Sequence, residues 1–274
     1  MTTTLRPIEP LQREADGARS RRYKVCVNSR PVGTVHLGTD PDFGDEVAKV
    51  LDLRIDERDR RRGRATVAAL AAEEVARGWG CRRIEVSVPA DAPAALRLAT
   101  ALGYVLRNRH MDKALGTAPP ELPAGSRGRP MTDAEFVVWV AVARLDYAAS
   151  WIERGVPEAE AHAKAKRDYE RMLPRGVASE GMTLSVLEHE GTRAGILWLG
   201  SREGRGFVYK VEVDAEHRGR GHGRSLMLLA EAQSVAAGRP AISLNVFAGN
   251  RPAERLYESL GYETAMHHLY KDLL

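Results

Sequence analysis

A long internal repeat limits the folds open to this chain of 274 residues more than any other feature of its sequence. When the sequence is aligned with itself at a shift of 158 residues, 21 of the 66 positions from 50 to 115 are identical. The run Leu102-Gly103-Tyr104 falls on Leu260-Gly261-Tyr262, and Lys113 falls on Lys271. A period of this length is too long for a solenoid and indicates a duplicated domain. The sequence therefore predicts two tandem copies of one fold.

The connection between the two copies is marked by its composition. Residues 116–130, GTAPPELPAGSRGRP, are rich in proline, glycine and alanine and show no apolar periodicity, which is typical of a linker. We therefore expect a first domain at 1–115, a linker at 116–130 and a second domain at 131–274. Each domain is long enough to bury a core of its own.

Each copy has the pattern of a mixed α/β domain. In the second copy, apolar periodicity predicts two long helices and then three strands, at 132–154, 157–173, 183–189, 194–200 and 207–213. The rest of that copy is predicted to be a helix, a strand, a helix and a strand, at 224–237, 241–247, 250–260 and 266–273. In the first copy only residues 11–21 stand where the second has the two long helices, so we expect that helical pair to be missing or vestigial.

Charge and cysteine content exclude several classes of protein. The net charge is +4, and residues 1–130 carry 23 basic against 17 acidic residues. Arginine outnumbers lysine 34 to 7 throughout, so we interpret this excess as solvated surface, and no basic strand interleaved with aromatic residues suggests a nucleic-acid site. Cys26 and Cys81 form neither a disulfide framework nor a zinc signature. They therefore give no reason to expect a metal. Because no apolar run has the length of a membrane span or a signal peptide, we expect a cytoplasmic protein.

A glycine-rich loop lies between a predicted strand and a predicted helix of the second copy. It reads Arg218-Gly219-Arg220-Gly221-His222-Gly223. Backbone N–H groups in such a loop and the dipole of the helix that follows favour an anion, and glycine lets a phosphate come close. The order of residues differs from the Rossmann and Walker fingerprints. A glycine-rich turn with solvated arginines is the alternative interpretation.

A second motif follows about 30 residues downstream. Asn250 is placed to cap a helix, and Tyr257 comes two helical turns later, so both side chains project from nearly the same face. A core aromatic is the alternative for Tyr257. Together, the Arg-x-x-Gly-x-Gly loop and the string from Asn250 to Tyr262 resemble the GNAT superfamily of acetyl-CoA-dependent N-acetyltransferases. The resemblance covers nearly all of the second domain and residues 23–115 of the first.

The resemblance implies an α/β (α+β) fold of two tandem GNAT domains, each a mixed sheet in which two parallel strands splay apart. It implies acetyl-CoA as co-substrate, with its pyrophosphate on the loop and its pantetheine arm along the backbone of the strand before the loop. It also implies that Tyr257 is the general acid that protonates the departing thiolate. The cofactor-binding residues that it implies are Val211, Val213, Arg218, Gly219, Arg220, Gly221, His222, Gly223, Arg224, Ser225 and Asn250.

The general base is harder to assign. An amine is protonated at neutral pH, so a proton must leave before the nitrogen attacks. Glu212, on the strand before the loop, is the best candidate for a catalytic base, and its neighbours should face the other side of the sheet. An ion pair or a solvent-facing carboxylate is the alternative. The strand position that acts as base in some family members falls on Asn245, which cannot take a proton. Four histidines are expected to be surface or loop residues: His189, His222, His267 and His268.

The first copy departs from these motifs where chemistry is expected. Its loop persists as residues 60–65, but Ala92 and Ala99 stand where the second copy has Asn250 and Tyr257. We therefore expect the first domain to be structural or to bind acetyl-CoA only weakly.

Two functions of different classes remain open. The motifs of the second domain predict an N-acetyltransferase that moves acetyl directly from acetyl-CoA to the primary amine of a small molecule, an antibiotic or other natural product, or a peptide. The degenerate first domain motivates the alternative, a tandem acyl-CoA-binding sensor or partner-docking protein with little turnover. Neither nucleic acid nor a membrane is expected as a partner, and the sequence does not decide between a monomer and a homodimer.

Overall fold

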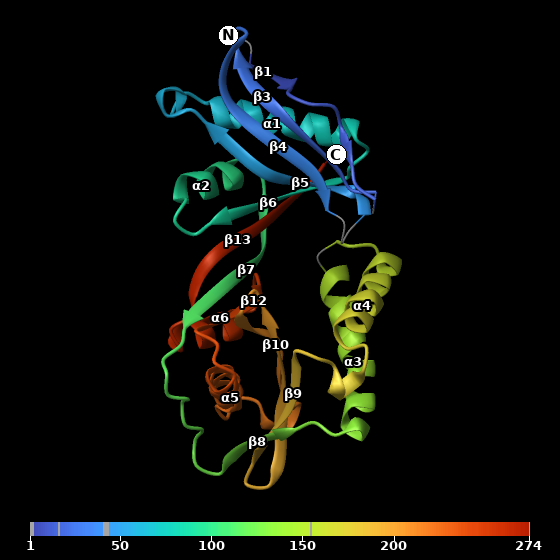
Figure 1. Ribbon diagram of the computed structural model, residues 1–274, viewed down its shortest axis with the longest axis vertical. Helices are drawn as coiled ribbons and strands as arrows, with labels where there is room; N and C mark the ends of the chain where they lie inside the picture. The colour runs from blue at the N-terminus through green and yellow to red at the C-terminus, as the bar shows by residue number, and fades with distance from the viewer. Residues whose placement is uncertain (1–2, 16, 41–43, 154, 274) are drawn as a thin grey trace. The chain divides into compact units, whose positions relative to one another are not determined.

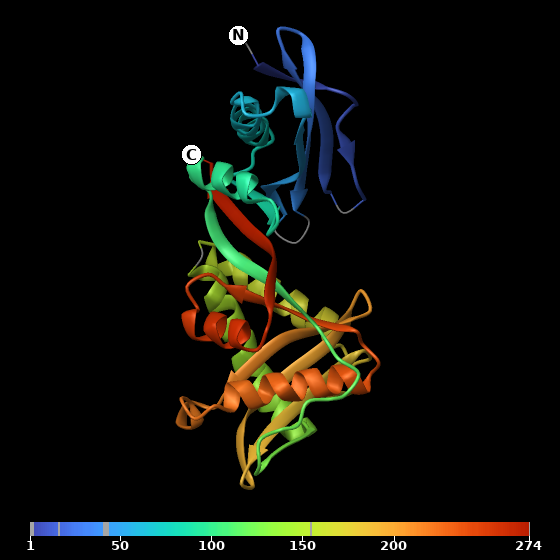
Figure 2. The same cartoon turned by 90° about the vertical axis from the view of Figure 1, so that its left-hand side faces the viewer.

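The computed structural model describes residues 3–15, 17–40, 44–153 and 155–273. The chain divides into two compact units, a first unit of residues 1–108 and 266–274 and a second unit of Arg109–Ala265 (Figures 1 and 2). The segment from Met266 onwards therefore belongs to the same unit as the N-terminal part of the chain. No helix in the described ranges is long and apolar enough to cross a membrane.

The first unit is a mainly antiparallel sheet with two helices. Its strands lie in the order β1-β3-β4-β5-β6-β13, β2 pairs with β3, and β5 and β6 are parallel. The strands are β1 (Thr3–Pro7), β2 (Gln12–Arg13), β3 (Arg19–Val27), β4 (Arg30–Asp40), β5 (Gly44–Ile55), β6 (Arg83–Pro89) and β13 (Glu263–Asp272). The helices are the short 3₁₀ turn η1 (Glu57–Asp59), α1 (Arg64–Gly78) and α2 (Pro93–Ala101).

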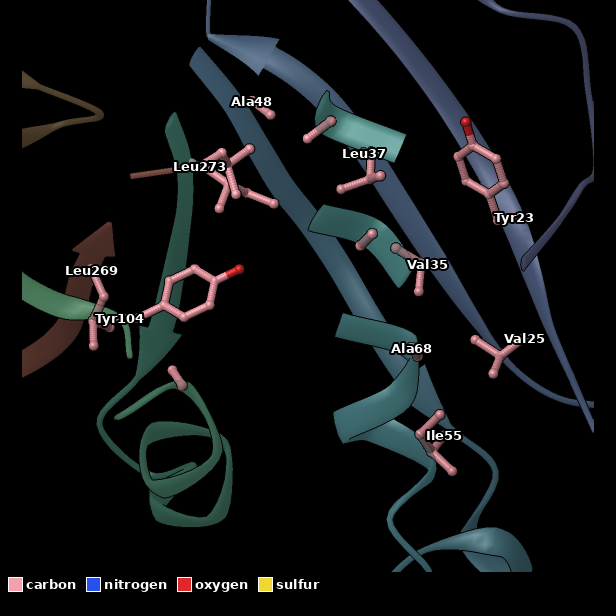
Figure 3. Packing of buried hydrophobic residues seen from close by; sticks show 14 of the residues in the cluster. Tyr23, Val25, Val35, Leu37, Ala48, Ile55, Ala68, Tyr104, Leu269 and Leu273 are labelled. Carbon is pink, nitrogen blue, oxygen red and sulfur yellow. The ribbon is translucent and has the colours of Figure 1, made fainter. Parts of the chain in front are cut away.

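Small residues let α1 lie close to the sheet of the first unit. Ala68, Ala72 and Ala76 recur one helical turn apart and are fully buried. They belong to the same hydrophobic cluster as Val35 and Leu37 of β4 (Figure 3). The helix therefore buries its alanine face, together with Arg64 and Glu73, while Val67 and Leu70 are exposed.

The second unit is a mixed sheet with helices on both faces. β12, β11, β10, β9 and β8 are neighbours in that order, and β7 lies next to β12. The strands are β7 (Val105–Ala114), β8 (Ser126–Pro130), β9 (Met182–His189), β10 (Thr192–Arg202), β11 (Arg205–Val213) and β12 (Ala241–Phe247). The helices are α3 (Asp133–Ile152), α4 (Glu158–Met172), α5 (His222–Ala236) and α6 (Arg251–Ser259), with the 3₁₀ turns η2 (Gly176–Ala178) and η3 (Ala215–His217).

Two separate cores fill the two faces of this sheet. On one face Leu226 and Met227 of α5 are fully buried against Leu197 and Leu244. On the other face α3 and α4 enclose an aromatic cluster, in which the rings of Trp139, Trp198 and Tyr169 lie 5.2 to 6.3 Å apart. Figure 1 shows α5 on one side of β9 and β10 and the α3–α4 pair on the other.

The greater part of the last strand of each copy lies in the unit built mainly by the other copy. β13, predicted to complete the second copy, pairs antiparallel with β6, so that Leu269 faces Val86 in register. Its Lys271 Nζ donates to Glu73 Oε2 at 2.7 Å and lies 5.7 Å from the centre of the Tyr104 ring. In the same way, residues 109–114 of β7 belong to the second unit. The two copies have therefore exchanged their final strands.

The exchange has a physical reason in the repeat itself. In the second unit Lys113 Nζ donates to both carboxylate oxygens of Glu231 at 2.8 Å and lies 5.6 Å from the Tyr262 ring. At the shift of 158, the lysine, glutamate and tyrosine of one site fall on the lysine, glutamate and tyrosine of the other. Because the two acceptor sites are alike, the lysine of each last strand meets a buried glutamate and a tyrosine in the unit built mainly by the other copy.

The fold prediction of tandem mixed α/β copies is confirmed. The helical pair appears in the second unit as α3 and α4, and in the first unit residues 11–21 contain only β2 and the start of β3 among those described. The expected linker differs at its end, because residues 126–130 form the edge strand β8. Its Arg127 and Arg129 both form ion pairs with Glu188, a polar edge that carries no apolar alternation to mark it as a strand.

Candidate functional site

Two parallel strands of the second unit separate halfway along their length. β11 and β12 pair only at Gly206–Ile242, Phe207–Ser243 and Val208–Leu244, although both strands continue beyond those residues. The register between β10 and β11 also shifts there, which leaves Tyr209 as the extra residue of a β-bulge. The predicted splay is therefore confirmed, and it leaves backbone groups of β11 without a strand partner on that side.

The first unit has the same irregularity. β5 and β6 pair from Val47–Arg83 to Val50–Val86, and the pairing ends there although β5 runs on to Ile55. The register of β4 with β5 shifts at the matching place. Both copies thus keep the architectural feature around which the predicted chemistry is built.

The glycine-rich loop joins the end of β11 to the start of α5. Gly219 and Gly221 have φ of +75° and +87°, a left-handed conformation that side chains disfavour, and Gly221 is the N-cap of α5. Arg218 Nε donates to the carbonyl of Val213 at 3.3 Å, which ties the loop to the strand. The first N–H groups of a helix have no partner within the helix, so the loop offers donors and the positive end of a dipole to an anion.

Other residues that were predicted to bind the cofactor pack or form hydrogen bonds within the protein. A Cβ on Gly223 would stand 3.1 Å from Leu256, so glycine lets α5 approach α6. Arg224 donates to Ser259 Oγ at 2.6 Å and links the same two helices, while Ser225 is buried. Val211 and Val213 pack toward the core beneath α5, as strand alternation predicts.

His222 is not the surface or loop residue expected from the sequence, because it is the first residue of α5. It is buried, and its ring centre lies 5.0 Å from that of His189 and 5.9 Å from that of His217. Burial is the largest cause that lowers the pKa of His222, and the neighbouring imidazoles and Arg220 lower it further. The surface prediction failed because the first residue of α5 turns its side chain toward the β9–β10 hairpin, a contact between residues far apart in the sequence.

Asn250 and Tyr257 lie on α6 as predicted. The Oδ1 atom of Asn250 accepts from the backbone N–H of Ala253 at 3.3 Å, so Asn250 caps the helix. The Tyr257 ring packs against the core beneath α5 and lies 6.0 Å from the Tyr262 ring. Burial raises the pKa of Tyr257 to about 12, so the phenol keeps its proton at neutral pH.

Glu212 lies on the face of β11 opposite to its valine neighbours. Its Oε2 atom is 3.2 Å from Lys210 Nζ, which is also 3.7 Å from Asp146 Oδ2 on α3. That oxygen is buried and receives no well-directed hydrogen bond among the described groups. Glu212 therefore forms an ion pair with Lys210, which was the alternative to a catalytic base. It also lies on the α3 side of the splayed strands.

Sequence reasoning missed the aromatic and polar groups that adjoin the splay on this face. The Trp151 ring of α3 meets Phe247 of β12 at 5.6 Å, and His110 of β7 lies 3.0 Å from Asn245. The identity of His110 with His268 in the internal alignment was the one available signal for the histidine.

The matching place in the first unit is built differently. Ala92 starts α2 without a side-chain cap, and Ala99 is buried in the core. The loop keeps its left-handed turn, with Arg61 at φ +58° and Gly63 at φ +70°. Asp59 beneath it accepts two hydrogen bonds from Arg30, at 2.6 and 2.9 Å, which lower its pKa.

Comparison with known proteins identifies a family in both halves of the chain. The acetyltransferase (GNAT) family matches residues 3–104 and again residues 145–262. A mycothiol acetyltransferase of Gordonia bronchialis is 31% identical, with 93% of this chain and 83% of the relative aligned. A mycothiol acetyltransferase of Saccharomonospora viridis is 29% identical over 94% of this chain and 85% of the relative.

Solved structures show the same fold. A GCN5-related N-acetyltransferase from Sphaerobacter thermophilus superposes with a TM-score of 0.59 and 20% identity, covering 92% of this chain and 80% of that one. A tandem GNAT protein from the clavulanic acid biosynthesis pathway gives a TM-score of 0.50 and 21% identity over 94% and 84% of the two chains. With both copies matched by the family and both carrying its splayed strands, this chain belongs to the GNAT acetyltransferases, enzymes that use acetyl-CoA, and is a tandem member of that family.

Proposed function

We propose that the second unit is catalytic and moves an acetyl group from acetyl-CoA directly to a primary amine. The observation that carries the proposal is the combination, within that unit, of the splay of β11 from β12 with a left-handed glycine loop at the end of β11. Peptide groups of Val211 and Val213, which lie beyond the paired part of the two strands, pair with the pantetheine arm. The loop at 218–223 receives the pyrophosphate.

Arg224, Ser225 and Asn250 each have polar atoms that are already bonded within the protein, which limits how they serve the cofactor site. The Arg224 guanidinium is bonded to Ser259, and the backbone N–H groups of Arg224 and Ser225 donate to the Gly221 carbonyl at 2.9 and 3.3 Å. These two residues therefore support the cofactor site by holding the first turn of α5 behind the loop. Because Asn250 Oδ1 caps α6, its Nδ2 group is the part that donates to the cofactor arm. Acetyl-CoA bound in this way presents its thioester at the splay, between the two separated strands.

Tyr257 and Glu212 are the proposed catalytic side chains. Acetylation of an ammonium removes two protons from the nitrogen, of which one ends on the coenzyme A sulfur and the other passes to solvent. Tyr257, protonated at neutral pH, gives its phenolic proton to the departing thiolate. Glu212 attracts the ammonium by its charge and is the base predicted from the sequence.

The acceptor is a cationic amine. Glu212 and Asp146 place two carboxylates around Lys210 on the α3 side of the sheet, which suits an ammonium group. The two mycothiol acetyltransferases aligned along most of this chain make a mycothiol-related amine the first acceptor to test. Other natural-product amines, including antibiotics, and peptide α-amines follow.

The first domain, residues 1–115, is not catalytic in this proposal and supports the second domain structurally. Ala92 and Ala99 supply neither a cap nor an acid, and the helical pair that covers the acceptor side in the second unit has no counterpart among the described residues of the first. We assign it a structural role with at most weak acetyl-CoA binding. The whole protein is assigned to the cytoplasm.

The test is release of coenzyme A from acetyl-CoA in the presence of a panel of amines, with the acetylated product identified by mass spectrometry. Turnover with at least one amine is expected. Tight binding of acetyl-CoA with no turnover across the panel would instead support the alternative, a sensor of acyl-CoA.

A further inference from the structure

A histidine lies at the point where β11 and β12 separate. The ladder between these strands ends at Leu244, so Asn245 is the first residue of β12 beyond it. The Nδ1 atom of His110, on β7, lies 3.0 Å from Asn245 Oδ1. An imidazole therefore stands beside the place where the thioester is proposed to sit.

His110 faces the side of the sheet from which the acceptor arrives. Its neighbour Met111 is buried in the core beneath α5, so strand alternation turns His110 toward the α3 side. The imidazole stacks on Phe207 with ring centres 6.2 Å apart and an angle of 16° between the planes. Its side chain is 26% exposed, which leaves it within reach of a ligand.

A carboxylate orients the ring. Asp112 Oδ1 lies 3.0 Å from His110 Nε2, is buried, and receives no well-directed hydrogen bond from the described groups. The other carboxylate oxygen accepts from Arg205 at 3.2 Å, which fixes the position of Asp112. A carboxylate at Nε2 favours the tautomer with hydrogen on that nitrogen and leaves the lone pair on Nδ1.

Asn245 suits both protonation states of this histidine. A carboxamide presents either its oxygen or its NH₂ group after a half-turn about its final bond. The oxygen accepts from a protonated Nδ1, and at a neutral Nδ1 the acceptor ammonium, in the step proposed below, takes the place of the carboxamide. Asn245, which cannot take a proton, is therefore paired with His110, which can.

We propose that His110 is a further catalytic residue, the group that removes the proton from the acceptor ammonium; this inference rests on the acetyl transfer proposed above. The N–H bond of the ammonium breaks, its proton passes to Nδ1, and the freed electron pair forms the C–N bond as the C–S bond breaks. His110 then gives its proton to solvent, the sulfur receives the Tyr257 phenolic proton, and the second proton that the nitrogen loses restores the Tyr257 phenol. Glu212 holds the ammonium by charge in this scheme.

The first unit offers a matched control. His268 falls on His110 at the shift of 158 and Ser87 falls on Asn245, and His268 Nδ1 lies 2.8 Å from Ser87 Oγ. The residue matching Asp112 is Tyr270, so no carboxylate stands at the equivalent place in the strand. The first unit thus has the histidine, but it has Tyr270 at the position of Asp112 and Ala99 at the position of Tyr257.

The experiment compares His110→Gln with His268→Gln, using the amine of the panel that the unaltered protein acetylates fastest. His110→Gln is expected to lower kcat about 100-fold, as loss of a general base does, with acetyl-CoA affinity by calorimetry unchanged. The variant should lose the limb of the pH profile that falls toward acid, and added imidazole should restore part of the rate. Glu212→Gln should act mainly on the KM of the amine, and His268→Gln should change neither constant.

Separate outcomes overturn the two proposals. Equal losses in His110→Gln and His268→Gln, or a pH profile and rate unchanged in His110→Gln, would overturn the role of His110 and leave acetyl transfer standing. If His110→Gln is poorly folded, Asp112→Asn keeps the imidazole and is expected to shift the same limb of the profile; an unshifted profile would count against the proposal. Binding of acetyl-CoA without turnover of any amine by the unaltered protein would overturn both.

Discussion

At the scale of single residues, burial acts in opposite directions on two titratable side chains of the second unit. It raises the pKa of Tyr257 to about 12 and lowers the pKa of His222. In both cases the uncharged form is favoured, because desolvation penalises charge whatever its sign. The phenol is therefore kept as a proton donor, and the imidazole beside the loop is kept neutral.

Replacement of Tyr257 by Phe tests the first of these effects. The ring keeps its packing while the proton donor is lost, and since a thiolate is already a good leaving group, kcat should fall by roughly 10–100-fold with acetyl-CoA affinity little changed. Steady-state kinetics and calorimetry on the same preparations measure both quantities. Tyr270→Phe in the first unit is the control and should behave like the unaltered protein. A normal rate in Tyr257→Phe, with chemistry rate-limiting, would make Tyr257 a core aromatic alone.

His222 gives a prediction for the pH dependence of stability. Its pKa is lowered in the folded state, so the unfolded chain binds more protons just below the ordinary histidine value near 6.5. The stability associated with neutral His222 is therefore complete above that value and is lost as the pH falls through the lowered pKa. Melting temperatures from pH 8 to pH 5 should fall less in His222→Leu than in the unaltered protein. Parallel curves for the two proteins would contradict the assignment, and His162→Leu, on exposed α4 surface, is the control.

At the scale of secondary-structure elements, each exchanged strand carries a lysine that pairs with a buried glutamate, at matching positions of the two copies. The side chains of Glu73 and Glu231 are 2% and 4% exposed, and each takes its lysine from a strand of the other copy. A buried carboxylate that loses its partner is strongly destabilising, whereas replacing both partners by apolar groups is often neutral. Each exchanged strand thus places a lysine on a buried glutamate near its C-terminal end.

Lys271→Met should therefore destabilise the first unit by about 3 kcal/mol. Adding Glu73→Leu to it should recover part of that loss, because the unpaired buried charge is removed. Urea unfolding gives the free energies, and amide hydrogen exchange should show the loss of protection in β6, which pairs with β13. Lys166→Met, from an exposed pair on α4, should change the free energy of unfolding by less than about 0.5 kcal/mol. A similar effect in both variants would mean that the Lys271–Glu73 pair has no special weight.

What could be predicted from the sequence follows the range of the interactions. The start of α3 was predictable because Thr132 and Glu135 form a capping box within four residues, and β12 was found at its true bounds because its apolar alternation is local. The splay and the loop came from motifs that lie within about 50 residues of each other. The exchange of β7 and β13 was not predictable, because two alike acceptor sites give a local pattern that fits either partner. The setting of His222 and of His110 depends on strands more than 30 residues away.

At the scale of the whole molecule, duplication has produced two units of which only the second has the residues predicted for catalysis. Both keep the splay and the left-handed loop, but only the second has the Asn250 cap and Tyr257. The loop of the first unit also carries Arg61 where the second has Gly219, at a left-handed φ that costs a non-glycine residue about 1 kcal/mol. The architecture has been retained after the site itself has changed.

Calorimetry should accordingly give one strong acetyl-CoA site per chain. Gly221→Glu should abolish it, since both the left-handed turn and the space for a phosphate are lost and a negative charge is added. Gly63→Glu, at the matching φ of +70° in the first unit, should leave the strong site intact. Residual binding in the Gly221→Glu protein should be weak and should decline with added salt, because the arginines at 60–62 would hold it. Two equal sites, or loss of the strong site in Gly63→Glu, would contradict the assignment of the strong acetyl-CoA site to the second unit.

The exchange of final strands also sets an order of events during synthesis on the ribosome. Residues 1–108 are made first, yet their sheet has no outer neighbour for β6, and Glu73 has no lysine, until residue 272 has been translated. The second unit is in the opposite position, because its borrowed strand β7 is synthesised before its own helices and strands. The part of the protein that is synthesised first is therefore the part that completes its fold last, and a nascent chain stopped before β13 would expose the open edge of β6 to other strands.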